Sequence, residues 1–473
     1  MSFTRQPLGF DEGWDLQAAR SLAENGTYAS FGSLYGGPDK VLDPHLSTGP
    51  TTMIPIAATF KVFGIGVLQA RVIIMLFYLA VIYLVAWYAY ERTKSGYAIL
   101  APLLFLLVAS QPVNFRLDVL GEIPAIAYAL GSLVAWHRKK FLLAGMLAAF
   151  AVLSKMIAFF LIIAGTLLLF VRLVRYWKKD RRPILIDAGW WVIGGALPLF
   201  FWEVFKFFQL GGSFAAYKQN WHDYVHFFME TGSGLSDNGT YLSLSERFNL
   251  FVSAFDIEKL LLLLIVVTAG VLLYLRRKQL RAAISANLYG LTFMGIYLLW
   301  WFLMANGKYT RYVVPLAAIS IGVVVAMIFQ LPKAVQHLKK IPRSVYHGAG
   351  LLLMTIALAG VHQYYFPMHV QQYSPSLADQ QRIAKRIAES HPLALTHMGW
   401  WQNPEIAFLG DLRSKDEHWR APGSTYELIL SPTQLVIVPD QYADGKTRCT
   451  EIYMQEVGYT YCKAYKPLNF KEH

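Results

Sequence analysis

Residues 137–172 read HRKKFLLAGMLAAFAVLSKMIAFFLIIAGTLLLFVR, an apolar stretch with basic residues at both ends and one lysine, Lys155, inside it. In polytopic membrane proteins, lysine and arginine mark the cytoplasmic loops. Because both ends are basic, we expect the stretch to leave the cytoplasmic side and return to it as two short helices. At ~1.5 Å per residue the first helix reaches only ~21 Å, which places Lys155 near an outer turn at membrane depth. A lysine there is costly unless it lines a polar cavity or meets an anion.

The composition of the whole chain also indicates a membrane protein. Its 473 residues are 55% hydrophobic and only 15% charged, and the mean hydropathy is +0.37. Soluble domains usually carry roughly 25% charged residues. The net charge of +13 does not indicate nucleic-acid binding, because the basic residues form short clusters between apolar runs, as in cytoplasmic loops. The sequence therefore predicts a polytopic α-helical membrane protein without a nucleic-acid partner.

Further apolar stretches predict the remaining membrane spans. With the two helices around Lys155 they make ten spans, an even number, so both termini should lie on the outer side. Segment 51–64 is also apolar, but counting it would reverse every later loop, so we expect a short helix at the outer membrane face. An outer N-terminus needs a preceding span to carry it across, which predicts a first helix missing from the sequence. The other eight predicted spans are 67–90, 97–110, 119–136, 184–206, 257–275, 284–304, 311–330 and 346–366.

The C-terminal part of the chain differs in character from the membrane region. Residues 370–473 are more polar, and we expect a small extracytoplasmic α/β domain there, after a transmembrane domain over residues 1–369. It holds the two cysteines, Cys449 and Cys462, between which a disulfide is chemically permitted on that side, although spacing alone does not fix the geometry. The expected elements are a helix through Leu377, Ile383, Ala384 and Ile387 and strands at 393–396, 406–409 and 435–438.

Two adjacent carboxylates, Asp11 and Glu12, precede a short helical pattern that ends near Gly26. Taken alone, one of them is most simply the cap of a surface helix, and Gly26 is its terminator. The charge map, however, places this stretch on the same side as Lys155 and the loop with Asp118. A chemical role for these carboxylates is therefore the alternative to a helix cap.

Other charged residues gather on the same predicted side. Carboxylates suit a general base, and cations suit a phosphate leaving group. Asp118 and Glu122 would share one helix face if the helix has begun at Asp118, whereas a loop acid and a helix cap are an equal alternative. The histidines of the outer loops, His45, His222 and His226, lack partners at metal-ligand spacing, so we predict no metal ligand, and dependence on a divalent metal stays open. The further cations on this side are Arg116, Lys308 and Arg311.

The order of these features resembles the polyprenyl-phosphate-dependent glycosyltransferases of the GT-C fold. The likeness is strongest to the branch with the protein O-mannosyltransferases and aminoarabinose transferases. It extends over most of the membrane region, and a weaker match follows at Lys308, Arg311, Tyr312 and Pro315. The four stretches that carry it are residues 10–26 with Phe-Asp-Glu, 49–71 from Gly-Pro to Gln-Ala-Arg, 117–124 (LDVLGEIP) and 145–155, which ends in Leu-Ser-Lys.

The resemblance implies a reaction at the outer face of the plasma (inner) membrane. Asp11, with Glu12 beside it in the catalytic loop, would deprotonate an acceptor hydroxyl. The hydroxyl attacks the anomeric carbon of a sugar on a polyprenyl phosphate, with inversion. The acceptor would be a lipid, a glycan or a protein. Lys155 and Arg311, helped by Lys308, would stabilise the released phosphate, while Glu12, Asp118, Glu122, Arg116 and Tyr312 would orient acceptor and sugar.

The chain departs from this family pattern in two respects. The family's first span is absent, in agreement with the missing first helix predicted above. Aminoarabinose-type members carry a lysine before a double proline, where this chain reads Ser47-Thr48-Gly49-Pro50, so the phosphate contact shifts to Lys155 and Arg311. A transporter or flippase of lipid-linked saccharides, with Lys155 as its charged site, is the alternative. Transporters often carry inverted repeats, and this sequence shows one interrupted stretch and no repeat.

Overall fold

The structure is a computed structural model of the chain, and the part that it describes covers most of the N-terminal two-thirds and pieces of the rest. By length and composition, three described helices can cross a membrane, at 67–91, 156–176 and 181–209. The described residues are 6–31, 39–93, 118–178, 181–227, 243–253, 284–285, 287–303, 376–390, 404–412, 435–439, 449–456 and 459–464.

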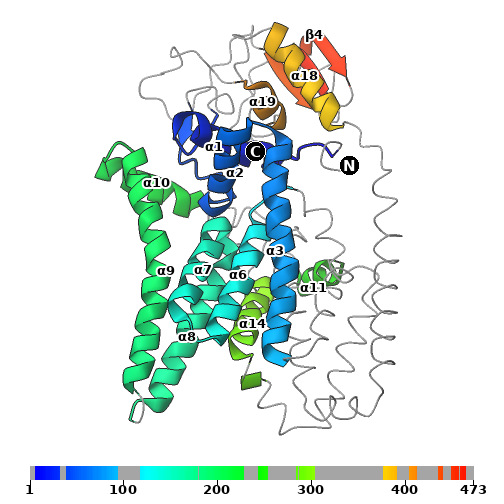
Figure 1. Cartoon of the computed structure of the whole chain (residues 1–473). Coiled ribbons are helices and arrows are strands. Elements are labelled where there is room, and N and C mark those ends of the chain that lie inside the picture. Colours follow the sequence, from blue (N-terminus) through cyan, green and yellow to red (C-terminus); the bar gives the residue numbers. More distant parts are fainter. Residues whose placement is uncertain are drawn as a thin grey trace.

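The membrane region is a bundle of helices that stand side by side (Figure 1). Apolar runs fold as helices in lipid because every backbone polar group must then be satisfied within its own segment. Aromatic rings fill the contact between three of them: Trp136 stacks on Tyr289 at 4.4 Å and meets Trp191 edge-on at 5.2 Å. The helices are α3 (Val67–Thr93), α6 (Glu122–His137), α7 (Phe141–Ser154), α8 (Phe159–Tyr176), α9 (Arg181–Gln209) and α14 (Leu288–Leu303).

Helices α7 and α8 confirm the two helices predicted around Lys155. Helix α7 ends at Ser154, Lys155 adopts an extended backbone with φ −151° and ψ 121°, and a short 3-10 turn, η4 (Met156–Ala158), leads into α8. The predicted spans 67–90, 119–136, 184–206 and 284–304 correspond to α3, α6, α9 and α14. The predicted spans 97–110, 257–275, 311–330 and 346–366 lie outside the described residues.

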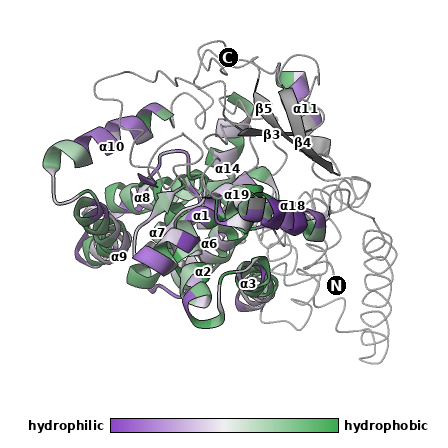
Figure 2. Ribbon diagram, turned by 90° about the horizontal axis from the view of Figure 1, so that it is seen from above, coloured by the Kyte–Doolittle hydropathy of each residue, from purple (hydrophilic) through white to green (hydrophobic). Residues whose placement is uncertain are grey.

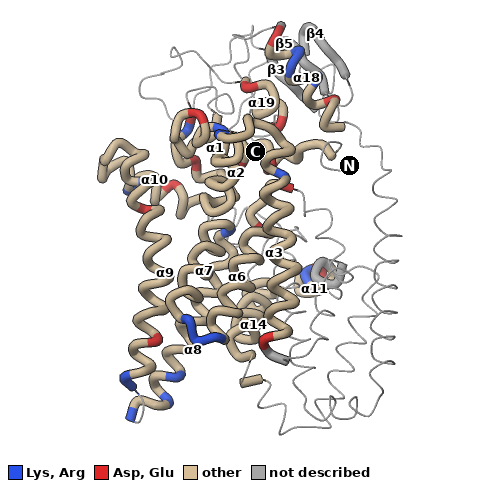
Figure 3. Tube along the Cα trace, in the orientation of Figure 1, with Lys and Arg blue, Asp and Glu red and all other residues tan. Residues whose placement is uncertain are grey.

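Charge is distributed unevenly along the bundle (Figure 3). Basic residues gather where α6 turns into α7 and where α8 turns into α9, and acidic residues gather on the elements above the opposite end. Seen from above, helix α18 is hydrophilic, while the bundle helices carry large hydrophobic areas (Figure 2). The basic residues of the two turns are Arg138, Lys139, Lys140, Arg172, Arg175, Lys178, Arg181 and Arg182.

A layer of short elements covers the end of the bundle opposite the basic turns. Helix α1 (Phe10–Asn25) begins after Gly9, whose N–H donates to the Glu12 carboxylate at 2.8 Å, and ends at Gly26 with φ 70°, as the sequence predicted. Helix α2 (Pro50–Phe63) confirms the short helix expected at 51–64. The layer also holds strand β1 (Ala29–Ser30), which pairs with β2 (Lys40–Val41), and helix α10 (Phe214–Phe227). Helix α11 (Leu244–Ser253) is not part of this layer and contacts α14.

The described C-terminal elements are two helices and a small sheet. Helix α18 (Leu377–Ser390) confirms the predicted helix, and β3 (Leu435–Pro439) confirms the predicted strand at 435–438. The strand expected at 406–409 is wrong, because this run lies in helix α19 (Pro404–Gly410), buried against α1. The run 393–396 lies outside the described residues. Strand β5 (Tyr459–Ala464) pairs antiparallel with both β3 and β4 (Cys449–Glu456), in the order β3-β5-β4.

The register of this sheet bears on the two cysteines. Cys449 lies opposite Ala464, and Cys462 lies opposite Ile452. The register shifts between Cys449 and Glu451, so the strand pairing does not fix the distance between the two cysteines. The disulfide between them stays a prediction.

Candidate functional site

The centre of the candidate site is the ammonium group of Lys155, at the break between α7 and α8. The residue is 7% exposed, and its Nζ lies 3.4 Å from Glu122 Oε1 on α6. The same Nζ donates a hydrogen bond to Ser47 Oγ at 3.1 Å. Ser47 Oγ lies 3.3 Å from Asp15 Oδ2, to which it donates, and the Thr48 N–H donates to the other oxygen, Asp15 Oδ1, at 3.2 Å. The buried lysine thus meets one anion, Glu122, directly and a second carboxyl group, Asp15, through Ser47.

Two glycines let the surrounding loops close on this lysine. The N–H of Gly49 donates to the Ser154 carbonyl at 3.0 Å, and the N–H of Gly121 donates to Thr48 Oγ1 at 3.1 Å. A Cβ at Gly49 would lie 2.0 Å from the Leu153 carbonyl oxygen, and one at Gly121 would lie 2.2 Å from that of Ser154. Both separations are far below van der Waals contact, so only glycine fits at either position.

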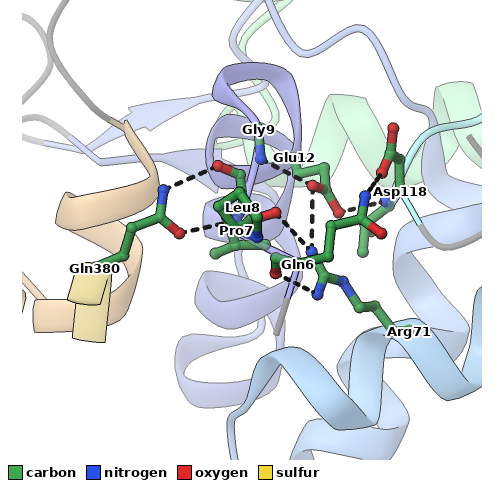
Figure 4. Close-up of polar contacts among 9 residues, drawn as sticks. Gln6, Pro7, Leu8, Gly9, Glu12, Arg71, Asp118 and Gln380 are labelled. Carbon is green, nitrogen blue, oxygen red and sulfur yellow. Dashed lines mark hydrogen bonds and ion pairs between the residues drawn. The ribbon is translucent and has the colours of Figure 1, made fainter. Parts of the chain in front are cut away.

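A second cluster surrounds the guanidinium of Arg71 on α3 (Figure 4). Its side chain is fully buried and donates to the carbonyl oxygens of Gln6 and Pro7 at 2.8 and 2.9 Å. Its Nη2 lies 3.5 Å from Glu12 Oε2. The Val119 N–H donates to Glu12 Oε1 at 2.8 Å, so Glu12 joins α1, α3 and the loop before α6. Glu12 is 3% exposed, and these contacts give it an anchoring role.

The loop acid Asp118 belongs to this second cluster. Gln6 Nε2 donates to Asp118 Oδ1 at 2.6 Å. Burial, the neighbouring Glu12 and, to a smaller extent, Glu122 raise the pKa of Asp118 well above its usual range, against the attraction of Arg71. Helix α6 begins at Glu122, so Asp118 lies in the loop before it. The two acids therefore do not share a helix face. Asp118 is a loop acid, as in the alternative, whereas Glu122 is the first residue of the helix and the cap position is Gly121.

Asp11 lies one helical turn before Asp15 on α1, so both carboxylates project from the same face of the helix. Asp11 is half-buried, whereas Asp15 is 1% exposed. Burial raises the pKa of Asp15 to about 7, and the nearby Asp11 adds to this increase, while Lys155 and Thr48 oppose it. Asp11 is thus the more accessible of two neighbouring carboxyl groups, and the buried one, Asp15, has a pKa of about 7.

The structure brings together Asp11, Glu12, Asp118, Glu122 and Lys155 of the predicted site residues. Residues that the sequence reasoning did not select join them. Asp15 had a local signal, its spacing of four from Asp11, whereas Arg71 and Ser47 act through partners far away in the sequence. The predicted site residues Arg116, Lys308, Arg311 and Tyr312 lie outside the described residues.

The histidines take two different positions. His45 Nδ1 lies 2.9 Å from Asp43 Oδ1, and the His45 ring meets Phe227 edge-on at 4.5 Å. His222 and His226 are exposed on α10. The described ranges contain no group of three or more histidine, cysteine or acidic side chains arranged to hold a metal ion.

The segment before α1 is held by the C-terminal part of the chain. Gln380 on α18 accepts a hydrogen bond from the Leu8 N–H at 2.8 Å and donates to the Leu8 carbonyl at 3.1 Å (Figure 4). Arg20 on α1 donates to the Phe408 carbonyl at 3.0 Å and pairs with Asp411 at 2.9 Å. Helix α18 therefore holds Leu8, which directly follows the two residues whose carbonyl groups accept from Arg71.

We expect Gln380→Ala to loosen this segment, because the buried N–H and carbonyl of Leu8 both lose their partner. An unsatisfied buried polar group costs about 1–3 kcal/mol. Hydrogen–deuterium exchange of the purified protein should show faster exchange at residues 6–12 and a lower melting temperature. The matched control is Gln381→Ala, the exposed neighbour on the same helix, which should leave both unchanged. Equal exchange in the two variants would contradict the role of Gln380.

Comparison with known proteins gives matches in structure alone. Models of known protein families give no match, and no curated protein matches the sequence. The crystal structure of ArnT from Cupriavidus metallidurans bound to undecaprenyl phosphate is similar, with a TM-score of 0.51 and 15% identity over 97% of this chain and 94% of that one. The archaeal oligosaccharyltransferase AglB from Archaeoglobus fulgidus, in complex with an inhibitory peptide and a dolichol-phosphate, has a TM-score of 0.51 and 11% identity over 89% of this chain and 58% of that one.

These likenesses establish the fold. The chain is a polytopic helical membrane protein of the GT-C fold, and the fold that the sequence resemblance implied is confirmed.

Proposed function

We propose that the chain is an integral-membrane glycosyltransferase that moves a sugar from a polyprenyl-phosphate donor to an acceptor hydroxyl. The observation that carries this proposal is the Lys155 ammonium, which is buried at a break between two apolar helices. Ser47 links it to Asp15, which lies one helical turn after Asp11 on α1. A fixed cation at membrane depth suits a lipid-linked phosphate, whose apolar tail lies in the bilayer. The fold likeness supports the same donor class, because ArnT and AglB were solved with undecaprenyl phosphate and dolichol-phosphate.

In the proposed reaction, Asp11 accepts the proton of the acceptor hydroxyl as the hydroxyl oxygen bonds to the anomeric carbon of the sugar. The bond from that carbon to the phosphate oxygen breaks, and the electron pair leaves with polyprenyl phosphate. Lys155 stabilises the negative charge that develops on this leaving group. Attack from the side opposite the phosphate inverts the anomeric configuration. Arg311 and Lys308, from the sequence resemblance, complete the proposed phosphate contacts, and Arg116 and Tyr312 contact the acceptor or sugar.

Asp118 and Glu122 are proposed to orient sugar or acceptor hydroxyls, and Glu12 to hold the loop that carries the base. Charge supports the proposed sidedness, because the basic turns lie at the opposite end of the bundle from α1 (Figure 3). Because basic loops face the cytoplasm, the site would face the extracytoplasmic side of the plasma (inner) membrane. The acceptor would be a lipid, a glycan or a protein on that side.

The test is turnover in detergent, where no compartments exist. Purified protein is mixed with a set of radiolabelled polyprenyl-phosphate sugars and a membrane extract as acceptor source. We expect release of polyprenyl phosphate together with label on an acceptor. A transporter or flippase, the alternative, would bind the lipid-linked sugar without consuming it. If the protein binds the donors but consumes none of them, the proposal of a glycosyltransferase is overturned and a transporter or flippase is favoured.

A further inference from the structure

A buried carboxyl group, Asp15, reaches Lys155 through a single hydroxyl. Ser47 Oγ accepts a hydrogen bond from Lys155 Nζ at 3.1 Å and donates its own hydrogen to Asp15 Oδ2 at 3.3 Å. A serine hydroxyl has one hydrogen to donate, so in this arrangement that hydrogen is committed to Asp15. The chain of contacts runs from α1 through the loop before α2 to the break between α7 and α8.

The charge balance of this group is already negative before any donor arrives. Lys155 contributes one positive charge, and Glu122, at 3.4 Å, contributes one negative charge that offsets it. An ionised Asp15 adds a second negative charge, and a phosphodiester donor would add a third. Asp15 is 1% exposed and Glu122 is 3% exposed, so water screens the repulsion between these negative charges poorly.

We propose that Asp15 takes up one proton when the donor phosphate binds at Lys155, so that phosphate binding and protonation of Asp15 are coupled. This inference rests on the proposed function, since it concerns the same phosphate site. The proton comes from solvent onto an Asp15 carboxylate oxygen and returns to solvent when the phosphate departs. No other bond forms or breaks in this step.

Protonation of Asp15 also changes what Ser47 can do. A neutral Asp15 can donate its O–H to Ser47 Oγ while its other oxygen still accepts from the Thr48 N–H. The Ser47 hydrogen is then free to donate to a phosphate oxygen beside Lys155. One proton therefore removes a repelling charge and supplies a second donor to the phosphate.

The sign of the pH dependence follows from the surroundings of Asp15. Burial raises its pKa to about 7, and Lys155, which opposes this increase, would be neutralised by a bound phosphate, so binding raises the pKa further. Among the described residues, the other titratable groups that face it are Asp11 on its own helix and Tyr28, whose hydroxyl donates to the Thr48 carbonyl. Burial raises the pKa of Tyr28 well above its usual range, so it stays neutral. Glu122 is connected to Asp15 through its ion pair with Lys155 and the Ser47 hydroxyl.

The experiment measures binding of a prenyl phosphodiester, the methyl ester of a polyprenyl phosphate, between pH 5.5 and 8.5 by native mass spectrometry or intrinsic tryptophan fluorescence. A diester keeps one negative charge over this range, whereas a phosphate monoester titrates near pH 6. For the wild-type protein we expect an affinity that is constant below about pH 6.5 and falls by up to tenfold per pH unit above pH 7.

Asp15→Asn removes the titrating group and keeps the shape, so its affinity should be nearly independent of pH and exceed that of the wild type at pH 8.5. His45→Gln is the control, because His45 lies in the same loop as Ser47 and its ring nitrogen contacts Asp43; this variant should keep the wild-type pH dependence. Melting temperatures confirm that each variant folds. An Asp15→Asn protein that keeps the wild-type pH dependence would overturn the coupling alone. Absence of diester binding to every folded protein at every pH would instead overturn the proposed function.

Discussion

Asp11→Asn is expected to lower the rate of sugar transfer by about a thousandfold while binding of polyprenyl phosphate stays within about twofold of the wild type. Asparagine has the shape of aspartate but cannot accept a proton at neutral pH. A positioned general base usually contributes ~10²–10⁴-fold to the rate. Asp11 is half-buried at the start of α1, where an asparagine fits without a new cavity, so the loss should appear in kcat rather than in folding.

The measurement is single-turnover release of polyprenyl phosphate by purified protein in detergent. The matched control is Glu24→Gln, because Glu24 is an exposed acid near the other end of the same helix and pairs with Arg20 at 2.9 Å. Arg20 keeps its contacts with the Phe408 carbonyl and Asp411 in this variant, so the control should keep wild-type kinetics. Full transfer activity in the Asp11→Asn protein would contradict Asp11 as the base and reopen the assignment among Asp15, Asp118 and Glu122.

The site contains two buried cations, Arg71 and Lys155, with different roles. Arg71 is fully buried, and its guanidinium holds two backbone carbonyls and Glu12, so it joins α1 to α3. Lys155 is a flexible point charge, and its described contacts are with side chains of Ser47 and Glu122 that can exchange one partner for another. A guanidinium with fixed donors suits the structural position, and an ammonium suits a site where a phosphate must enter and leave.

Much of the membrane fold was predictable because its signals are local. The basic ends of residues 137–172 and the single lysine within them were enough to predict α7, the turn and α8. The short apolar run 406–409 misled the prediction, because such a run does not distinguish a strand from a buried helix. Helix α19 forms there against α1, which local sequence does not reveal.

The site was predictable only in part, because several of its contacts join distant residues. Asp11 and Lys155 stood out as acidic and basic residues in unusual surroundings. Arg71 binds carbonyl groups 64 and 65 positions away, and Glu12 accepts from Val119, 107 positions away. The pairing of Leu8 with Gln380 spans 372 positions. No periodicity or motif spacing reports contacts of this kind, so the anchoring roles of Glu12, Arg71 and Gln380 required the structure.

Lys155→Met is expected to abolish binding of the prenyl phosphodiester and to lower kcat/KM for sugar transfer by about 10²–10³-fold, the usual cost of removing a preorganised group that stabilises developing charge. Methionine keeps the length of the apolar stem and removes only the ammonium. The substitution also breaks the ion pair with Glu122, and breaking a buried pair from one side costs about 3–5 kcal/mol. Loss of activity could therefore reflect unfolding, and a second variant has to separate the two effects.

The double variant Lys155→Met with Glu122→Gln removes both charges of the pair, so it should recover most of the melting temperature and none of the phosphate binding. Lys206→Met on α9 is the matched control, since Lys206 is also 7% exposed and pairs with a glutamate, Glu203, at 3.0 Å. It should lower stability and leave diester affinity within about twofold of the wild type. If the stabilised double variant still binds the phosphodiester, the phosphate must be held elsewhere in the chain, and Lys155 serves only to neutralise Glu122.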